Sequence, residues 1–412
     1  MTNEFSSPLT FKNNPSHSKA ERVPPQARFI LQLLQKIERG ILRLECPDGS
    51  VHLFGNSDDD CAPVTLSLKN WEPCRAALKS GDIGFAETYI NGDWQTDNLA
   101  RLLALFIHNR NAVESAIYGK WWGNLLYRLR HLFNRNSRAG SRRNIHAHYD
   151  LGNRFYRLWL DPSMTYSSAL FSRPEMSLQE AQGAKYQRIL DQLGLKSGER
   201  VLEIGCGWGG FAEIAAQQGV NVTGLTLSTE QREFASQRLA LAGLSGQTTL
   251  RLQDYRDCEG QFDAIASIEM FEAVGEAYWD SYFACIAARL KPAGRACVQT
   301  ITIDDALFAR YRKGTDFIQQ YIFPGGMLPS IPVFRAHAAR HGLKVVDEYA
   351  FGRDYARTLS LWMEAFLGRT QAVQAEGFDT RFIRTWAFYL AYCEAGFNAQ
   401  SIDVVQFTLQ KA

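Results

Sequence analysis

A glycine-rich turn is the segment of this sequence best suited to binding a small ligand. The run Glu203-Ile204-Gly205-Cys206-Gly207-Trp208-Gly209-Gly210 follows an apolar, strand-like segment and precedes a helix-like one. Ligands of open α/β sheets bind beyond the carboxyl ends of the strands, where glycine lets them approach the backbone closely. The spacing G-x-G-x-G-G differs from the G-x-G-x-x-G fingerprint of dinucleotide sites. Taken alone, the turn could hold a dinucleotide or be only a tight turn.

The ends of the next two predicted strands favour a methyltransferase pocket over a NAD pocket. The second strand ends in Thr226 and Leu227 and carries no acid for the ribose hydroxyl that a dinucleotide site binds. The third strand ends at Asp254 and Tyr255, which could meet the edge of an adenine. These positions suit the nucleoside portion of S-adenosylmethionine.

The elements that must position these residues alternate along the second part of the chain. Strand-like segments near 201–206, 221–227, 249–254, 262–270 and 295–303 are separated by helix-like segments. Such alternation predicts an α/β fold with a parallel sheet and helices on both faces. The strands are preceded by a helical lead-in over 178–194.

The first part of the chain has a different texture. Residues 1–25 are polar and predict a flexible tail, and residues 26–110 predict a small α+β unit. Pro47-Asp48-Gly49 separates two alternating runs and predicts a hairpin, and helices are expected near 72–79, 83–90 and 97–109. A basic stretch over 111–144 predicts a linker, and the catalytic domain is expected over 145–412.

Several segments together resemble the cyclopropane-fatty-acyl-phospholipid synthases, to which the mycolic-acid methyltransferases are related. They are HYDLGNRFYRLWLDPSMTYSSALF (148–171), VLEIGCGWGG, GLTLSTEQ (224–231), QDYRD (253–257), MFEAVG (270–275) and YIFPGGMLPS (321–330). The resemblance covers 145–412 in order, and residues 26–110 resemble the smaller lipid-binding domain of two-domain members. It implies a Rossmann-like domain that transfers a methylene group from S-adenosylmethionine to the cis double bond of an unsaturated acyl chain in phospholipid.

The resemblance also implies roles for individual residues. Cofactor contacts carry over to Tyr166, Ser167, Glu203, Gly205, Cys206, Gly207, Thr226, Leu227 and Gln231, with Asp254 and Tyr255 beside the adenine. The base of the relatives is a bound bicarbonate ion, whose cradle maps onto Ser168, Glu272, Gln299, Ile301 and Tyr355. Ser168 stands in place of a cysteine and Gln299 in place of a histidine. Both keep hydrogen-bonding ability, but Gln299 cannot take a proton, so Glu272 acts either through bicarbonate or directly.

Two further groups of residues have a competing structural interpretation. Aromatic faces stabilise cations, and the candidates are Tyr166, Phe271, Tyr278, Tyr321 and Tyr355, although any one of them could serve core packing. Cys393 matches a cysteine once regarded as catalytic in the family. Because the chemistry needs no thiolate and no basic residue flanks it closely, a packing role is favoured. The carbocation could also undergo a hydride shift before losing a proton, which would leave a methylene- or methyl-branched chain.

Composition limits the remaining possibilities. A net charge of +2 gives no argument for nucleic acid, and eight widely spaced cysteines without a CxxC pair argue against a zinc site. No signal peptide or membrane-spanning run is visible, so a cytoplasmic enzyme at the inner face of the membrane is expected. Residues 117–143 interleave Trp121, Trp122 and other apolar residues with arginine and lysine. They predict either a contact with an anionic membrane or an interdomain helix. The resemblance leaves open a homodimer, and a non-catalytic lipid-binding protein is the rival interpretation.

Overall fold

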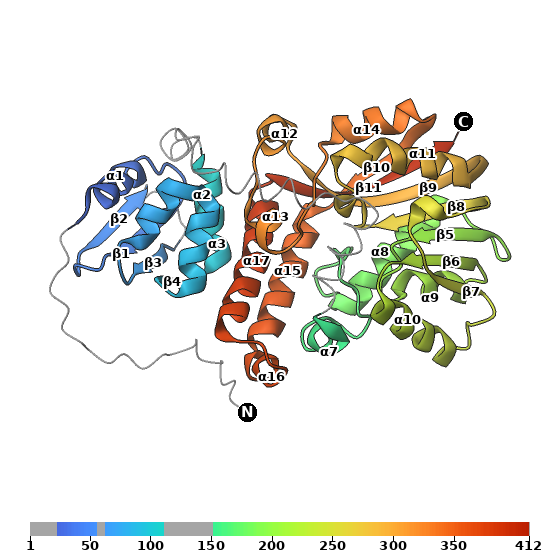
Figure 1. The fold of residues 1–412 in the computed structure, drawn as a ribbon, viewed down its shortest axis with the longest axis horizontal. Coiled ribbons are helices and arrows are strands. Elements are labelled where there is room, and N and C mark those ends of the chain that lie inside the picture. The colour runs from blue at the N-terminus through green and yellow to red at the C-terminus, as the bar shows by residue number, and fades with distance from the viewer. Residues whose placement is uncertain (1–22, 56–61, 111–150, 412) are drawn as a thin grey trace.

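The computed structural model describes residues 23–55, 62–110 and 151–411 (Figure 1). Most of the predicted tail and the whole predicted basic linker therefore lie outside the described residues. The first helix, α1 (Pro25–Leu34), begins with proline in its first turn. Proline suits that position because its fixed φ matches the helix and its missing N–H has no intrahelical partner there. The helix thus begins at Pro25, the last residue that the sequence analysis assigned to the tail.

The N-terminal unit contains a four-stranded sheet in the order β2-β1-β3-β4. Its strands are β1 (Ile41–Glu45), β2 (Val51–Gly55), β3 (Val64–Leu68) and β4 (Trp94–Thr96). The predicted hairpin is confirmed, since β1 and β2 pair antiparallel. The helices are α2 (Glu72–Asn91) and α3 (Leu99–His108). Gly81, at a φ of 60°, breaks α2 where the sequence predicted two helices.

The catalytic unit, within residues 151–411, contains a seven-stranded sheet in the order β10-β11-β9-β8-β5-β6-β7 (Figure 1). Strands β5 (Arg200–Ile204), β6 (Asn221–Thr226), β7 (Thr248–Leu252), β8 (Phe262–Ile268) and β9 (Leu290–Ile303) are parallel, as predicted. The last strand, β11 (Ile402–Lys411), runs antiparallel to β9 and to β10 (Leu343–Ala350). The sheet is therefore not wholly parallel. The helical segment after β10 returns the chain to the end of the sheet where β10 finishes, so β11 runs back antiparallel between β10 and β9.

Helices cover both faces of this sheet, which confirms the α/β class. Alternate strand residues enter opposite cores: Leu202 packs with α11 (Trp279–Arg289) and α14 (Ile331–Arg340), whereas Val201 packs with α8 (Leu178–Leu193) and α9 (Gly210–Gln217). Helix α10 (Thr229–Leu241) contributes Leu239 to the second core. The carboxyl ends of β5 to β8 are thereby fixed around one point.

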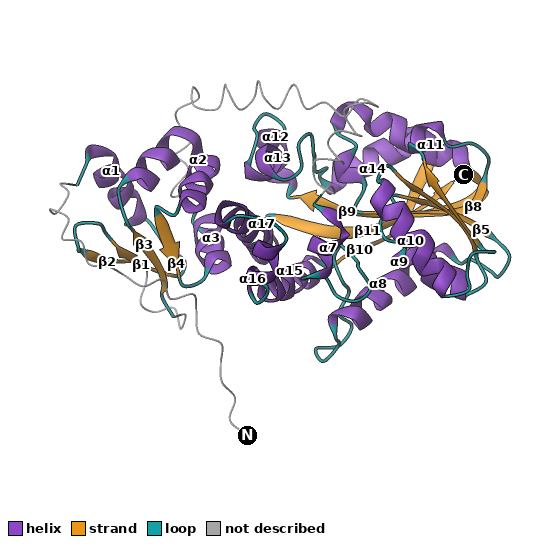
Figure 2. Cartoon of the chain, turned by 60° about the horizontal axis from the view of Figure 1, so that its bottom comes forward, coloured by secondary structure: helices purple, strands orange, loops and turns teal. Residues whose placement is uncertain are grey.

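A helical layer joins the two units. Helices α15 (Gly352–Leu367), α16 (Thr370–Ala375) and α17 (Thr380–Asn398) lie between the two sheets (Figures 1 and 2). The Phe388 ring of α17 packs 5.7 Å from that of Tyr89 on α2, and Arg384 Nε donates to Tyr89 O at 2.6 Å. One continuous apolar core runs from the N-terminal strands into α15 and α17. The remaining α-helices of the described residues are α7 (Gly152–Arg157), α12 (Asp305–Tyr311) and α13 (Phe317–Tyr321).

Candidate active site

A small cavity of about 160 Å³ lies at the carboxyl ends of the parallel strands. Every residue predicted to contact the cofactor lines this single cavity: Tyr166, Ser167, Glu203, Gly205, Cys206, Gly207, Thr226, Leu227, Gln231, Asp254 and Tyr255. They come from five separate parts of the chain. The fold therefore gathers these eleven positions around one space.

The glycine turn is shaped for a ligand. Gly205 and Gly207 have φ values of 85° and 48°, in the region that glycine adopts without strain. The N–H groups of Gly205 and Cys206 both donate to Leu225 O, which closes the turn against β6. A Cβ on Gly207 would meet no protein atom within 4 Å. The space beside Gly207 is thus open for a ligand.

The polar groups around this cavity are held in fixed orientations. Thr226 Oγ1 lies 2.9 Å from Gln231 Oε1, and Arg256 donates through two nitrogens to Asp254. Glu203 is buried, which raises the pKa of its carboxyl well above the usual range, and its Oε2 has no partner among the described residues. Buried polar atoms are rarely left unpaired. Together with the open glycine turn, the unpaired oxygen fits a polar ligand such as S-adenosylmethionine.

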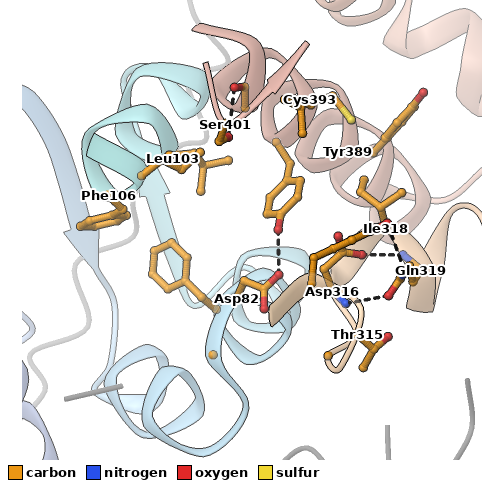
Figure 3. A pocket seen from close by; sticks show the side chains of 18 of the residues that line it. Asp82, Leu103, Phe106, Thr315, Asp316, Ile318, Gln319, Tyr389, Cys393 and Ser401 are labelled. Atoms are coloured by element: carbon orange, nitrogen blue, oxygen red, sulfur yellow. Dashed lines mark hydrogen bonds between the residues drawn. The ribbon is translucent and has the colours of Figure 1, made fainter. Parts of the chain in front are cut away.

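A second cavity, of about 970 Å³, runs between the N-terminal unit and the catalytic unit. Its walls are mainly apolar and include Leu44, Leu66, Leu103 and Phe106 from the N-terminal unit. Figure 3 shows Leu103 and Phe106 on one side of this space and Tyr389 and Cys393 of α17 on the other. Glu272, Ile301, Tyr355 and Cys393 line it as well.

The two cavities share three wall residues, Tyr166, Glu269 and Ala273. A ligand in the small cavity would therefore face one in the apolar cavity across these side chains. The Tyr166 hydroxyl lies 2.6 Å from that of Tyr389, which fixes the ring at the junction.

The predicted bicarbonate cradle divides into two groups around two carboxylates. Glu269 accepts hydrogen bonds from the Ser168 N–H at 2.8 Å, from Gln299 Nε2 at 2.7 Å and from the Tyr355 hydroxyl at 2.6 Å. Glu272 Oε1 instead accepts from the Ile301 N–H at 2.5 Å. The Ser168 hydroxyl points away and donates to Ala169 O.

These contacts decide whether bicarbonate fits the cradle. The four donors that would hold the anion, on Ser168, Gln299, Tyr355 and Ile301, already donate to protein carboxylates. A bicarbonate ion there would also lie against the negative charge of the Glu269 carboxylate, which is unfavourable in a buried site. The residues present therefore do not fit a bound bicarbonate.

Glu269 lines both cavities, and the motifs in the sequence did not single it out. It lies directly after β8, at the carboxyl end of a buried parallel strand, where ligand-contacting residues are expected. Its φ of 48° is uncommon for a residue with a side chain. Glu269 is the first acid of SIEMFEAVG, but the family resemblance assigns the catalytic role to the second, Glu272.

Lys185 is a second residue that the sequence did not single out. It lies on α8, which was interpreted only as a helical lead-in, and its side chain is fully buried. Its Nζ donates to Ser167 Oγ at 2.6 Å and to Gln182 Oε1 at 2.7 Å. Burial lowers the pKa of Lys185, while attraction to Glu269, Asp161 and Glu203 opposes that shift.

The aromatic candidates separate into two classes. Tyr166 and Tyr355 line the apolar cavity, whereas Phe271 is packed in the core against Trp279 and Phe334. Tyr278 and Tyr321 line neither cavity, and Tyr321 donates to Glu87 on α2.

Cys393 lines the apolar cavity, but burial raises the pKa of its thiol above the usual range. A neutral thiol is a poor nucleophile. The position agrees with the packing role.

Residues 23–55, 62–110 and 151–411 contain neither a metal-binding cluster nor a membrane-spanning helix. No group of three or more His, Cys, Asp or Glu side chains there could hold a metal ion. No helix among these residues is long and apolar enough to cross a bilayer.

Comparisons with known proteins agree with this geometry. The family described as mycolic acid cyclopropane synthetase matches residues 136–407. A tuberculostearic acid methyltransferase of Mycobacterium tuberculosis is 39% identical over 89% of this chain and 87% of its own. A cyclopropane-fatty-acyl-phospholipid synthase of Escherichia coli is 36% identical, over 85% and 88%.

A solved structure is similar as well. The mycolic acid cyclopropane synthase CmaA1, complexed with SAH and CTAB, superposes with a TM-score of 0.62 at 36% identity, over 66% of this chain and 98% of that one. The chain therefore belongs to the mycolic acid cyclopropane synthetase family and is an S-adenosylmethionine-dependent methyltransferase of the cyclopropane synthase type.

Proposed function

We propose that this enzyme alkylates the cis double bond of an unsaturated fatty-acyl chain in membrane phospholipid and forms a cyclopropane ring. The observation that carries the proposal is the junction of the cofactor cavity with the long apolar cavity at Tyr166, Glu269 and Ala273. An alkene held in the apolar cavity would face the methyl donor there. The volume of about 970 Å³ is at the upper end of ordinary ligand pockets and suits a long flexible chain.

The residues of this chain orient the substrate, exclude water and stabilise the developing charge. When bound, S-adenosylmethionine supplies an electrophilic methyl group. The apolar walls orient the acyl chain and exclude water, which would otherwise trap the carbocation left on that chain. The rings of Tyr166, at the junction, and of Tyr355, in the wall of the apolar cavity, can offer negative π-density to the cation. Loss of a proton from the transferred carbon then closes the ring.

A branched product is the second candidate. If hydride shifts along the acyl chain before the proton is lost, a methylene branch forms instead of a ring. The relative that is 39% identical is named a tuberculostearic acid methyltransferase, whereas the relative at 36% is named a cyclopropane synthase. Similar identity to both keeps the two outcomes in competition. A non-catalytic lipid-binding role is disfavoured by the complete ring of cofactor-lining residues.

The partners follow from the substrate. An enzyme acting on phospholipid must reach a bilayer, so we propose peripheral contact with an anionic inner membrane surface through residues 117–143, together with homodimerisation and no binding of nucleic acid. Bicarbonate, the base that the family resemblance implies, is not part of this proposal, because the donors of its cradle already bind protein carboxylates.

Mass spectrometry of the lipid product tests the function. The purified enzyme is incubated with vesicles of dioleoyl phosphatidylglycerol and a trideuteriomethyl donor, and the acyl chains are released for analysis. A gain of one methylene unit, with one deuteron lost, supports the proposal. The proton NMR spectrum separates the upfield ring signals from vinylidene signals. Cofactor binding without any modified lipid would favour the non-catalytic alternative.

A further inference from the structure

We propose that Glu269 is the base of this enzyme and that its carboxylate replaces an exogenous bicarbonate ion. The inference rests on the proposed function and names the group that takes the proton. Glu269 is the only carboxylate among the described residues that lines both the cofactor cavity and the apolar cavity. It is therefore in reach of the carbon that passes from one cavity to the other.

The hydrogen bonds around Glu269 require an acceptor. The Ser168 backbone N–H can only donate, and it does so to Oε1 at 2.8 Å. The Tyr355 hydroxyl donates to Oε2 at 2.6 Å. Gln299 Nε2 adds a third bond, to Oε1. A carboxylate that accepts three donors is stabilised in its ionised form.

A relay of hydrogen bonds fixes the direction of the Gln299 amide. Arg188 can only donate, and its NH1 contacts Gln406 Oε1 at 2.8 Å. Gln406 must then present its Nε2, which meets Gln299 Oε1 at 3.0 Å across the β9–β11 pair. Gln299 is left with Nε2 toward Glu269. The relay thus fixes a donor toward the carboxylate, whereas an orientation with the oxygen inward would repel it.

Charge in the surroundings also favours an ionised Glu269. Burial raises the pKa of Glu269, and attraction to Lys185, whose own pKa burial lowers to about 7, opposes that rise. Lys185 reaches the site through Ser167, the neighbour of the donor Ser168. Two other acids that line these cavities are Glu203 and Glu272, and burial raises the pKa of both carboxyls. Proximity to Glu269 contributes to the rise at Glu272, which reaches about 8.

Glu272 is less suited to the role for two reasons. It lines the apolar cavity but not the cofactor cavity, and its Oε1 is held by the Ile301 N–H. With a pKa near 8 it is mostly protonated at neutral pH. A protonated acid cannot accept the proton, so the pair divides into one carboxylate and one neutral acid, as like charges in one site require.

The step balances without another reactant. The alkene electrons form a bond to the methyl carbon, the carbon–sulfur bond breaks toward sulfur, and the cation remains on the acyl chain. A Glu269 oxygen takes a proton from the transferred carbon. The electron pair of that C–H bond closes the ring, or forms the exocyclic double bond after a hydride shift. An ordinary carboxylate is basic enough because a carbocation is a far stronger acid than a carboxylic acid.

Three variants test the assignment: Glu269→Gln, Glu269→Gly and, as the matched control, Glu272→Gln. Glu269→Gln keeps shape and removes the base, so kcat should fall by about 10²-fold or more, the range typical of a lost general base. Glu272→Gln keeps the acceptor for Ile301 and should lose less than about tenfold. Wild-type turnover in degassed, bicarbonate-free buffer should be unchanged.

Glu269→Gly adds a gain-of-function arm. Glycine suits the φ of 48°, and removing the side chain frees the Ser168, Gln299 and Tyr355 donors. Activity of this variant should be low and should recover when bicarbonate or formate is added. Binding of ¹³C-bicarbonate, followed by NMR, should occur with Glu269→Gly and not with the wild type.

Four results separate the outcomes. Wild-type activity of Glu269→Gln overturns the inference, as does a wild-type requirement for bicarbonate. A severe loss in Glu272→Gln with little loss in Glu269→Gln would return the role to Glu272. If neither the wild type nor any variant modifies lipid, the proposed function fails. Bicarbonate binding still decides the inference: binding by the wild type overturns it, and binding by Glu269→Gly alone supports it.

Discussion

Single backbone positions set the shape of the cofactor cavity. Gly207 lines the cavity at a φ of 48° with open space where a Cβ would stand. Gly198, at a φ of 88° and also with nothing within 4 Å, lies in an exposed turn that lines neither cavity. The two glycines share backbone strain on substitution but differ in what a side chain would obstruct.

Gly207→Val should abolish S-adenosylmethionine binding, whereas Gly198→Val should bind it normally. Both should lose roughly 1–2 kcal/mol of stability, the cost of a side chain in the left-handed region. Isothermal titration gives the affinity and thermal unfolding the stability. Normal cofactor affinity in Gly207→Val would mean that the ligand does not occupy the space beside the turn.

At the scale of elements, helices α2 and α17 bring the N-terminal unit against the catalytic unit and enclose the apolar cavity between them. Ala77 faces this cavity from α2, while Arg75 on the same helix is exposed and forms an ion pair with Glu72. The acyl chain would therefore contact both units, although the cofactor residues all lie in one. Changes in α2 should separate lipid binding from cofactor binding.

Ala77→Trp should shorten the apolar cavity and lower kcat/KM on phospholipid vesicles by about tenfold or more. The tryptophan ring would overpack the cavity once an acyl chain is bound, and overpacking an apolar interior costs about 1–3 kcal/mol of free energy. Cofactor affinity should stay unchanged, because Ala77 does not line the small cavity. Arg75→Trp, which breaks only an exposed ion pair worth little, is the control. Equal loss in both variants would argue that α2 matters for stability alone.

For the whole molecule, buried acids make stability depend on pH. Burial raises the pKa of Asp316 to about 7, of Glu394 to about 7 and of Glu272 to about 8. The ordinary pKa of these groups is 3.8 for aspartate and 4.5 for glutamate. At a pH between the ordinary and the raised pKa values, the folded protein binds more protons than the unfolded chain. The contribution of these acids to stability is therefore full at low pH and is lost as pH rises.

The melting temperature should therefore fall between about pH 5 and pH 8. Asp316→Asn keeps the acceptor for the Gln319 N–H at the start of α13 and should flatten that fall. Asp280→Asn serves as control, because its exposed carboxyl has a pKa lowered by His337 and His341 and titrates below this window. An unchanged slope in Asp316→Asn would contradict a neutral Asp316.

The basic segment belongs to the same scale, although it lies outside the described residues. Reversing the charge of Arg128, Arg130, Arg135 and Arg138 should weaken binding to anionic vesicles in a flotation assay, since each basic residue contributes roughly 1 kcal/mol near such a surface. The wild-type binding should fade toward 1 M salt, where the Debye length is about 3 Å. Binding that is insensitive to salt would assign membrane contact to another surface.

The sequence by itself determined the local features. Strand and helix periodicities predicted the parallel core of the sheet, and the glycine turn with its neighbouring strand ends predicted the cofactor site. These signals are short-range: a two-residue alternation and a turn that only glycine adopts are written in consecutive residues. The eleven cofactor positions, taken from motifs in register, consequently lie around one cavity.

Only the tertiary structure decided which carboxylate sits in the cradle. The donors to Glu269 come from Ser168, Gln299 and Tyr355, so the site joins positions 101, 30 and 86 residues distant from it along the chain. The meeting of the two cavities and the burial of Lys185 likewise depend on packing between distant elements. The direction of a side chain and the charge of its neighbours are properties of that packing, and no local pattern of residues encodes them.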